Sequence, residues 1–105
     1  MFRYHLQNEE EKVVVKLEGD LDIDATEIIE MGLNKEILNS TGVVELDFKN
    51  IDFVDSSGIG LLITFVTNLK EIERVLTIKN LKEDIRTVFE LLQLDEILGK
   101  DVIVL

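Results

Sequence analysis

The chain has 105 residues, a length typical of one domain with a single core, and its hydrophobic fraction of 46% argues against disorder. Its 22 acidic and 11 basic residues give a net charge of −11, which opposes binding to nucleic acid and favours a basic or mixed protein partner. The absence of cysteine excludes disulfides, thiolate catalysis and zinc sites built on sulfur.

The N-terminal third predicts a β-hairpin. Phe2, Tyr4 and Leu6 alternate with polar residues, which is the period of a half-buried strand. After a polar turn, the β-branched run at 13–17 predicts a second strand that pairs with the first, and the residues at 19–22 are expected to end it.

A helix is expected to follow the hairpin. Asp24 and Glu27 have the spacing of a capping box, so the helix should begin there. Apolar residues at every fourth position continue to about Leu38, before the sequence Ser40-Thr41-Gly42 stops the helix. The expected apolar face consists of Ala25, Ile29, Leu33 and Ile37, with Ile28 beside it.

The central stretch at 43–70 predicts a strand, a turn and a second helix. Apolar residues alternate from Val43 to Phe48 and lead into a polar corner at Lys49 and Asn50. The sequence Asp55-Ser56-Ser57-Gly58 follows, and beyond it apolar residues recur at helical spacing to about Lys70.

The C-terminal third predicts a strand at 75–79, a third helix and a last edge strand at 102–105. Asn80 and Glu83 repeat the capping-box spacing before the helix. Its apolar face is expected to consist of Ile85, Val88, Phe89 and Leu92. The predicted order is β-β-α-β-α-β-α-β, an α/β domain whose sheet is mostly parallel after an N-terminal hairpin.

The paired serines at the start of the second helix allow two interpretations. A serine or aspartate before a helix commonly caps it, and Gly58 would relieve crowding at the turn. Alternatively, one serine accepts a phosphate, because unpaired N–H groups and the helix dipole at this end favour an anion. The added charge beside Asp55 would then change the attraction of this surface for a partner.

Leu61 and Phe65 lie outside the core stripe of the second helix, which consists of Ile59, Leu62, Ile63, Val66 and Leu69. They belong either to a broad buried face or to an exposed apolar patch that anchors a partner near Ser56. The periodicity leaves both interpretations open.

Three segments in order resemble the STAS-domain anti-sigma factor antagonists. The longest reads VELDFKNIDFVDSSGIG at 44–60, the upstream segment reads LEGDLD at 17–22, and the downstream segment reads VFELLQLDEI at 88–97. The similarity covers about 13–98 and implies a single STAS domain over 1–105. The family usually continues into a C-terminal helix, which this sequence, ending after Gly99-Lys100-Asp101, is expected to lack.

The resemblance implies a phosphorylation switch. In this family the unphosphorylated antagonist binds an anti-sigma factor that is also a GHKL-type serine kinase, and thereby releases a sigma factor. Phosphorylation ends the binding and a serine phosphatase restores it. The serine directly after aspartate carries the phosphate, which is Ser56 here, with Ser57 as the alternative. The residues expected to contact the partner are Asp22, Asp55, Ser56, Ser57, Gly58, Ile59, Leu61 and Phe65.

The chain is expected to be a protein ligand and substrate rather than an enzyme. It has no glycine-lysine nucleotide loop, so ATP and Mg²⁺ are expected on the kinase, with no cofactor on this chain. His5, the only histidine, lies on the polar side of its strand and suggests no catalytic triad. No apolar run approaches the ~20 residues that span a bilayer, so we expect a cytoplasmic protein without membrane insertion.

Three other interpretations remain. Asp47 near a predicted strand end suggests a phospho-accepting aspartate receiver, although the hairpin start fits that class poorly. Asp20, Asp22 and Asp24 suggest a cation site, although no further ligand loop follows. A STAS domain can also be an accessory or scaffold module of a stress-signalling or transporter complex, and the identity of the partner distinguishes that role.

Overall fold

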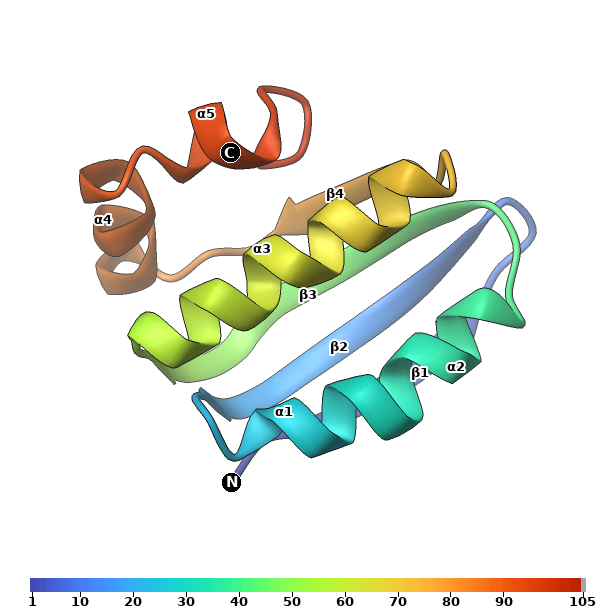
Figure 1. The fold of residues 1–105 in the computed structure, drawn as a ribbon, viewed down its shortest axis with the longest axis horizontal. Coiled ribbons are helices and arrows are strands. Elements are labelled where there is room, and N and C mark those ends of the chain that lie inside the picture. Colours follow the sequence, from blue (N-terminus) through green and yellow to red (C-terminus); the bar gives the residue numbers. More distant parts are fainter. Residues whose placement is uncertain (105) are drawn as a thin grey trace.

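A computed structural model of the chain describes residues 1–104 as a two-layer α/β domain (Figure 1). Its sheet has four strands in the order β1-β2-β3-β4. β1 (Arg3–Asn8) pairs antiparallel with β2 (Lys12–Leu21), which confirms the hairpin. β3 (Val43–Val54) and β4 (Leu76–Lys79) then add in parallel, which confirms the mostly parallel sheet.

Two long helical segments cover one face of this sheet (Figure 1). The first runs without a break through α1 (Ala25–Ile28), the π-helical turn η1 (Ile29–Leu33) and α2 (Asn34–Leu38). The second is α3 (Ser56–Glu71). The predicted apolar face of the first helix is confirmed, because Ala25, Ile29, Leu33 and Ile37 are all buried.

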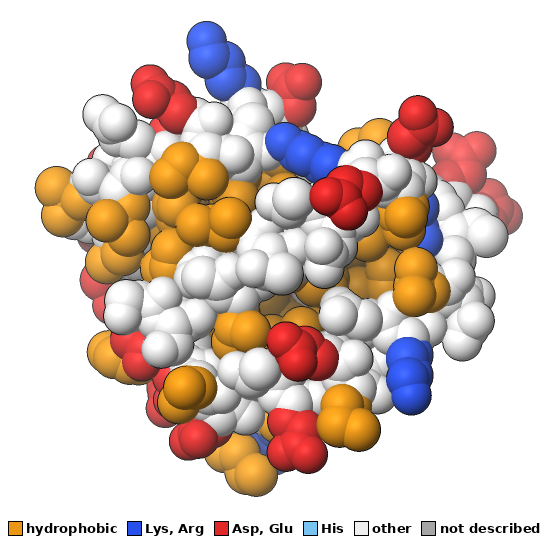
Figure 2. All heavy atoms as spheres, viewed as in Figure 1, with side chains coloured by type: hydrophobic (Ala, Val, Ile, Leu, Met, Phe, Trp, Pro, Cys, Tyr) orange, Lys and Arg blue, Asp and Glu red, His pale blue; other side chains and the backbone are white. Residues whose placement is uncertain are grey.

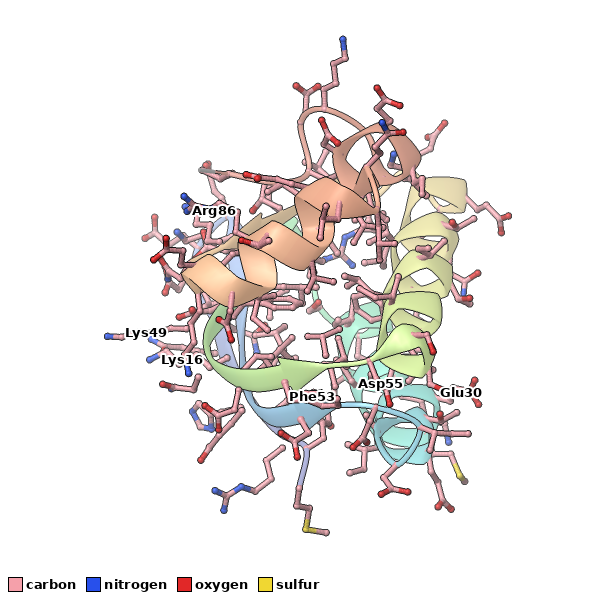
Figure 3. The ribbon with its side chains drawn as sticks, turned by 90° about the vertical axis from the view of Figure 1, so that its left-hand side faces the viewer. Lys16, Glu30, Lys49, Phe53, Asp55 and Arg86 are labelled. Carbon is pink, nitrogen blue, oxygen red and sulfur yellow. The ribbon has the colours of Figure 1, made fainter. Side chains whose placement is uncertain are left out.

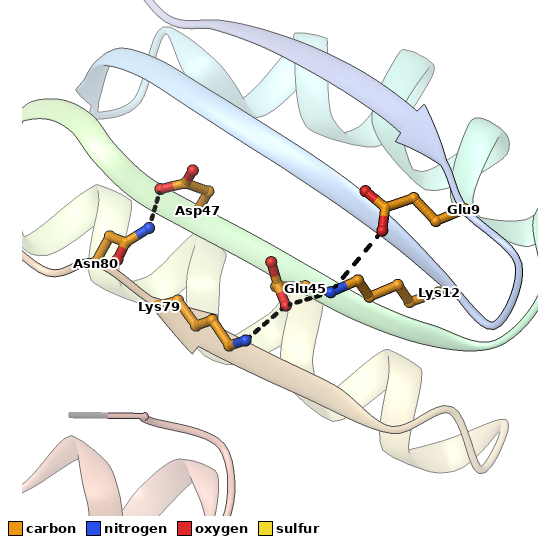
Figure 4. A network of polar contacts seen from close by, with 6 residues as sticks. All are labelled: Glu9, Lys12, Glu45, Asp47, Lys79 and Asn80. Atoms are coloured by element: carbon orange, nitrogen blue, oxygen red, sulfur yellow. Dashed lines mark hydrogen bonds and ion pairs between the residues drawn. The ribbon is translucent and has the colours of Figure 1, made fainter.

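The core lies between these helices and the sheet. Val15, Leu46, Phe48 and Ile78 point into it from the strands and are at most 1% exposed. Phe48 also meets Phe89 of α4 (Glu83–Leu91) edge to face, with the ring centroids 6.0 Å apart. Alternate strand residues, including Glu45 and Lys79, point to the opposite face, which no helix within residues 1–104 covers (Figure 4).

β3 is longer than predicted because its register slips twice against β2. Between the pairs Lys16–Asp47 and Glu18–Asn50, and again between Gly19–Ile51 and Asp20–Phe53, β3 advances one residue more than β2. Each slip leaves two consecutive residues exposed, Lys49 and Asn50 at the first and Asp52 and Phe53 at the second. The polar corner expected at Lys49 and Asn50 is therefore a bulge within a continuous strand, and the residues at 19–22 prolong β2 to Leu21 rather than ending it earlier.

Neither predicted capping box forms. Asp24 precedes α1 without a capping hydrogen bond, because the carboxylate that acts there is Asp22, whose Oδ1 accepts from the Asp24 N–H at 3.0 Å. Asn80 has a left-handed backbone, with φ 62°, and its side chain donates to Asp47 on β3 instead. α4 begins two residues later than that spacing suggests, after Lys82.

The C-terminal segment differs from the predicted edge strand. A short helix, α5 (Leu94–Leu98), follows α4, and the two lie beyond β4 at one edge of the sheet (Figure 1). Ile103 then makes a single parallel bridge to Ile78, with Ile78 N–H donating to Val102 and Val104 N–H donating to Ile78. Leu105, the last residue of the predicted strand, lies outside the described residues.

The start of α3 is docked directly on the end of β2. The Asp55 N–H donates to the Leu21 carbonyl oxygen at 3.3 Å. A Cβ atom added to Gly58 would lie 1.8 Å from that same oxygen. Because no side chain fits in this space, Gly58 allows the first turn of α3 to contact the β2 backbone. This contact fixes the position of the two serines that precede Gly58.

The open face of the sheet carries a network of paired charges (Figure 4). Glu45 on β3 lies 2.9 Å from the Lys79 Nζ and 3.4 Å from the Lys12 Nζ. The hydrogen bond from Lys79 holds the pKa of the Glu45 carboxyl below its usual value, helped by the charge of Lys12 and opposed by partial burial. Glu45 thus bridges the strands on either side of β3.

Replacement of either glycine near the start of α3 by alanine should change the free energy of unfolding, but in opposite directions. Gly58→Ala should lower the free energy of unfolding by about 1–3 kcal/mol, because the new methyl group displaces the helix from Leu21. Gly60→Ala is the matched control: nothing lies within 4 Å of its added Cβ, so it should gain about 0.5–1 kcal/mol of helix stability. Urea unfolding measures both, and equal effects would contradict the docking contact.

The Glu45 network should contribute stability that disappears in acid. Because the pKa of the Glu45 carboxyl is lower in the folded state than its ordinary value of 4.5, the contribution is present above pH 4.5 and falls as the pH drops through the folded-state pKa. Glu45→Gln should therefore flatten the loss of unfolding free energy between about pH 5 and pH 3. Glu10→Gln, at an exposed position with no ion pair among residues 1–104, is the control. Parallel curves for wild type and Glu45→Gln would refute this role.

Candidate functional site

The paired serines lie where the carboxyl ends of β2 and β3 meet. Leu21 and Val54 are partners in the parallel ladder, so the residues that follow them, Asp22 and Asp55, leave the sheet at the same edge. Ser56 and Ser57 form the first two positions of α3. They follow Asp55, which Figure 3 shows at the end of the sheet where α3 begins. The structure thus brings together four of the predicted site residues, Asp22, Asp55, Ser56 and Ser57.

Asp55 is the cap of α3, which leaves the serine hydroxyls free of that task. Its backbone is extended, and its Oδ1 accepts from the Gly58 N–H at 2.9 Å. Ser56 and Ser57 are exposed, and neither hydroxyl makes a hydrogen bond within residues 1–104. Of the two interpretations of this turn, simple capping therefore describes Asp55, whereas the serines are accessible for modification.

Asp22 orders the neighbouring loop. Its side chain accepts from the Asp24 N–H, and its backbone carbonyl accepts from the Ala25 N–H at 3.0 Å. These bonds turn the chain from β2 into α1. Half-buried Asp22 therefore lies beside the serine turn as part of a fixed loop. Within the described residues, no group of three His, Cys, Asp or Glu side chains is placed to hold a metal ion.

Several residues expected to contact a partner are instead buried. Ile59 is 7% exposed and Phe65 is 6% exposed, and both belong to the hydrophobic core. The hypothesis of an exposed apolar patch at Phe65 is therefore wrong, because the buried face of α3 is broad enough to include it. Leu61 is half-buried against the core and keeps part of its surface accessible. Gly58 is buried against Leu21, so its small size is required within the chain rather than by a partner.

Two exposed hydrophobic residues near the serines were not predicted. Ile23, which follows Asp22, is 68% exposed, and Phe53, two residues before Asp55, is 51% exposed. Figure 3 shows Phe53 and Asp55 at the same end of the sheet. The alternation of Asp22-Ile23-Asp24, which places an isoleucine between polar residues outside any strand, was the available sequence signal for Ile23.

A groove runs from the serine turn between the first helix and α3. It is lined by Ile23 and Glu30 on one side and by Ser57, Gly60 and Leu61 on the other. Figure 2 shows this face of the molecule hollowed in the middle, with hydrophobic side chains at the bottom of the hollow. The groove therefore places a mostly apolar surface, with the Glu30 carboxylate among its lining groups, beside Ser57.

Asp47, the residue of the aspartate-receiver interpretation, lies elsewhere. Because β3 continues to Val54, Asp47 is in the middle of the strand rather than near its end. Its Oδ1 accepts from the Lys49 N–H at 2.9 Å and from the Asn80 side chain at 3.0 Å on the open face of the sheet (Figure 4). The aspartate-receiver interpretation relied on Asp47 lying near the end of a strand, and the structure does not place it there.

Two solved structures of an anti-sigma factor antagonist are similar to this chain over nearly its whole length. The chain is similar to the anti-sigma factor antagonist SpoIIAA in its unphosphorylated form, with 25% identity, a TM-score of 0.72, and coverage of 98% of this chain and 89% of that one. It is also similar to the phosphorylated form of SpoIIAA from Bacillus, with 25% identity, a TM-score of 0.69, and coverage of 98% and 92%.

A third similar structure belongs to a protein of another kind. It is a sulfate transporter family protein from Wolinella succinogenes, with 14% identity, a TM-score of 0.73, and coverage of 86% of this chain and 73% of that one. No helix within residues 1–104 of the present chain is long and apolar enough to cross a membrane.

The family itself follows from a direct match. A model of the STAS domain family matches residues 4–103, which is nearly the whole chain and includes all three segments that carried the resemblance. The chain belongs to the STAS domain family.

Proposed function

We propose that this chain is an anti-sigma factor antagonist controlled by phosphorylation of Ser56. Its unphosphorylated form binds an anti-sigma factor that is also a GHKL-type serine kinase, and that binding releases a sigma factor. The single observation that carries the proposal is the exposed serine pair on α3, whose cap is supplied by Asp55. The similarity at 25% identity to SpoIIAA, a protein that exists in both unphosphorylated and phosphorylated forms, supports it.

The chemistry of the switch divides between the two proteins. The γ-phosphoryl group of ATP moves to the Ser56 Oγ, the hydroxyl proton passes to a base of the kinase, and ADP leaves. The kinase holds ATP and Mg²⁺. This chain presents the nucleophile at a helix start whose unpaired N–H groups favour an anion. A serine phosphatase hydrolyses the phosphoserine and restores the hydroxyl. The chain therefore acts as substrate and ligand, not as an enzyme, in the cytoplasm.

Electrostatic repulsion explains how the phosphate ends binding. A phosphoserine adds about −1.5 to −2 charges at neutral pH. At Ser56 this charge is added next to Asp55 and close to Asp22, in a chain whose net charge is already −11. The kinase, which must bind the negatively charged phosphates of ATP beside this surface, then meets a second anion at the interface. Binding is reversed without a change of fold.

Ser56 is assigned as the phosphoacceptor and Ser57 as the alternative. Both are exposed, so accessibility alone does not separate them. Ser56 directly follows the capping Asp55, and Ser57 lines the groove between the first helix and α3. In the proposed complex, Ser56 therefore faces the phosphate donor, while Ser57, Leu61 and exposed Ile23 contact the body of the partner.

A second role is supported by one observation. The fold similarity to the sulfate transporter family protein agrees with a STAS domain that acts as an accessory module of a transport complex. In that role the exposed edge with Phe53 and Ile23 contacts the larger assembly and Ser56 stays unmodified.

The switch predicts opposite effects for two substitutions of the same residue. Ser56→Ala should bind the kinase persistently and accept no phosphate. Ser56→Asp should bind at least about tenfold more weakly, equivalent to about 1.4 kcal/mol, because a carboxylate partly mimics the added charge. Calorimetry with the purified kinase measures both affinities. Equal affinities for the two variants would contradict the electrostatic switch.

Ser57→Ala is the matched control. It should keep phosphate incorporation close to wild type, because Asp55 rather than Ser57 caps the helix and the phosphoacceptor Ser56 is unchanged. Its unfolding free energy is measured first, so that a loss of structure is not mistaken for a loss of the phosphorylation site. Phosphate incorporation that persists in Ser56→Ala and disappears in Ser57→Ala would transfer the assignment to Ser57.

A further inference from the structure

A hollow with a volume of about 480 Å³ lies beside α4, α5 and the segment that follows them. Its apolar lining consists of Leu81, Phe89 and Ile103, of which Leu81 and Phe89 are buried. This volume falls within the ~300–1,000 Å³ of pockets that hold small molecules. The hollow is formed by elements other than the serine turn, so its role is separate from the proposed function.

Arg86 provides the strongest indication of a ligand. Its Nε atom is the one buried side-chain nitrogen or oxygen without a hydrogen-bond partner in the part of the chain that the structure describes. Its guanidinium also makes no ion pair there, although Glu90 follows it by one helical turn. Figure 3 shows the side chain on α4 directed to the side of the molecule away from α3.

A buried N–H group normally has an acceptor, because its desolvation is otherwise uncompensated. A guanidinium binds carboxylates especially well, since two parallel N–H groups can donate to the two oxygens. Lys100, a second cation, lines the same hollow. Together they provide a place for the carboxylate of a small molecule.

The hollow is also lined by negatively charged side chains. Glu90, Asp95 and Glu96 line it together with Gln93. Gln93 has a left-handed backbone, with φ 54°, at the junction where α4 ends and α5 begins. Three carboxylates disfavour a purely anionic ligand and provide acceptors for an ammonium group. The lining therefore matches a molecule with both charges and an apolar body.

We propose that this hollow binds an apolar α-amino acid as its zwitterion. The ligand carboxylate accepts from Arg86, with Lys100 nearby, and the ligand ammonium donates to the carboxylates of α4 and α5. The side chain of the ligand lies against Phe89 and Leu81. Binding then joins α4, α5 and the C-terminal segment through one small molecule.

The test uses the purified full-length chain and four probes. Amide chemical shifts of the ¹⁵N-labelled protein are followed during titration with leucine, phenylalanine, 3-phenylpropanoate and phenethylamine. We expect saturable shifts at α4 and α5 with the two amino acids. Binding should weaken at least tenfold for each analogue, because one lacks the ammonium group and the other lacks the carboxylate.

Arg86→Gln should abolish the amino-acid shifts, whereas Lys49→Gln, at an exposed cation on β3, should leave them unchanged. If Arg86→Gln proves to be unfolded by circular dichroism, Lys100→Gln replaces it and should weaken binding. No saturable shift at α4 and α5 with either amino acid at millimolar concentration would overturn the proposal. Equal binding of the amino acids and phenethylamine would also overturn it, because the carboxylate would then contribute nothing.

Discussion

The contact between the start of α3 and the end of β2 is the constraint on which the rest of the site depends. Leu21 accepts the Asp55 N–H and also faces Gly58, so one carbonyl oxygen fixes both the last residue before the helix and its first turn. Any side chain at Gly58 would separate the two elements. Ser56 and Ser57 lie between these fixed points, and they are exposed because the residues on either side are docked.

The two bulges of β3 explain how the site acquires its flanking residues. Without the added residues, strict alternation after Phe48 would send every second side chain to the core. Instead Ile51 and Val54 are buried three residues apart, and Asp52 and Phe53 are exposed together between them. This change of period places Phe53 on the surface near Asp55. Bulges beside functional sites commonly redirect side chains in this way.

The element order, the sheet and the serine turn could be predicted from sequence because each rests on local patterns that the tertiary structure does not oppose. The apolar face of the first helix is an example, since residues four apart must lie on one side of a helix. The three family segments then gave the fold as a whole, and the family match confirms it. Local pattern and global fold agree for most of this chain.

What could not be predicted depends on contacts between residues far apart in the sequence. Asn80 was expected to cap α4, but its amide donates across 33 positions to Asp47. Arg74 binds the carbonyl oxygens of Ile37 and Ser40 at the end of α2, at 3.1 and 3.2 Å, and nothing in the local sequence indicates that partner. Phe65 was ambiguous for the same reason, because the width of a buried helix face is set by what packs on it.

The proposed phosphorylation switch depends on the accessibility of two serine hydroxyls beside a fixed carboxylate. Asp55 caps the helix, so in the proposed switch Ser56 accepts a phosphate without loss of the cap. In this proposal, acidic residues near the turn attract a cationic partner before modification and increase repulsion after it.

The most direct measurement is to isolate the protein from its native cells with its bound partners, and to identify those partners and every phosphorylated residue by mass spectrometry. We expect a serine kinase bound to the unmodified chain, and a phosphorylated fraction that carries its phosphate on Ser56 and lacks the kinase. A chain without phosphate, recovered with a transporter or a scaffold protein, would contradict the switch and support the accessory-module role.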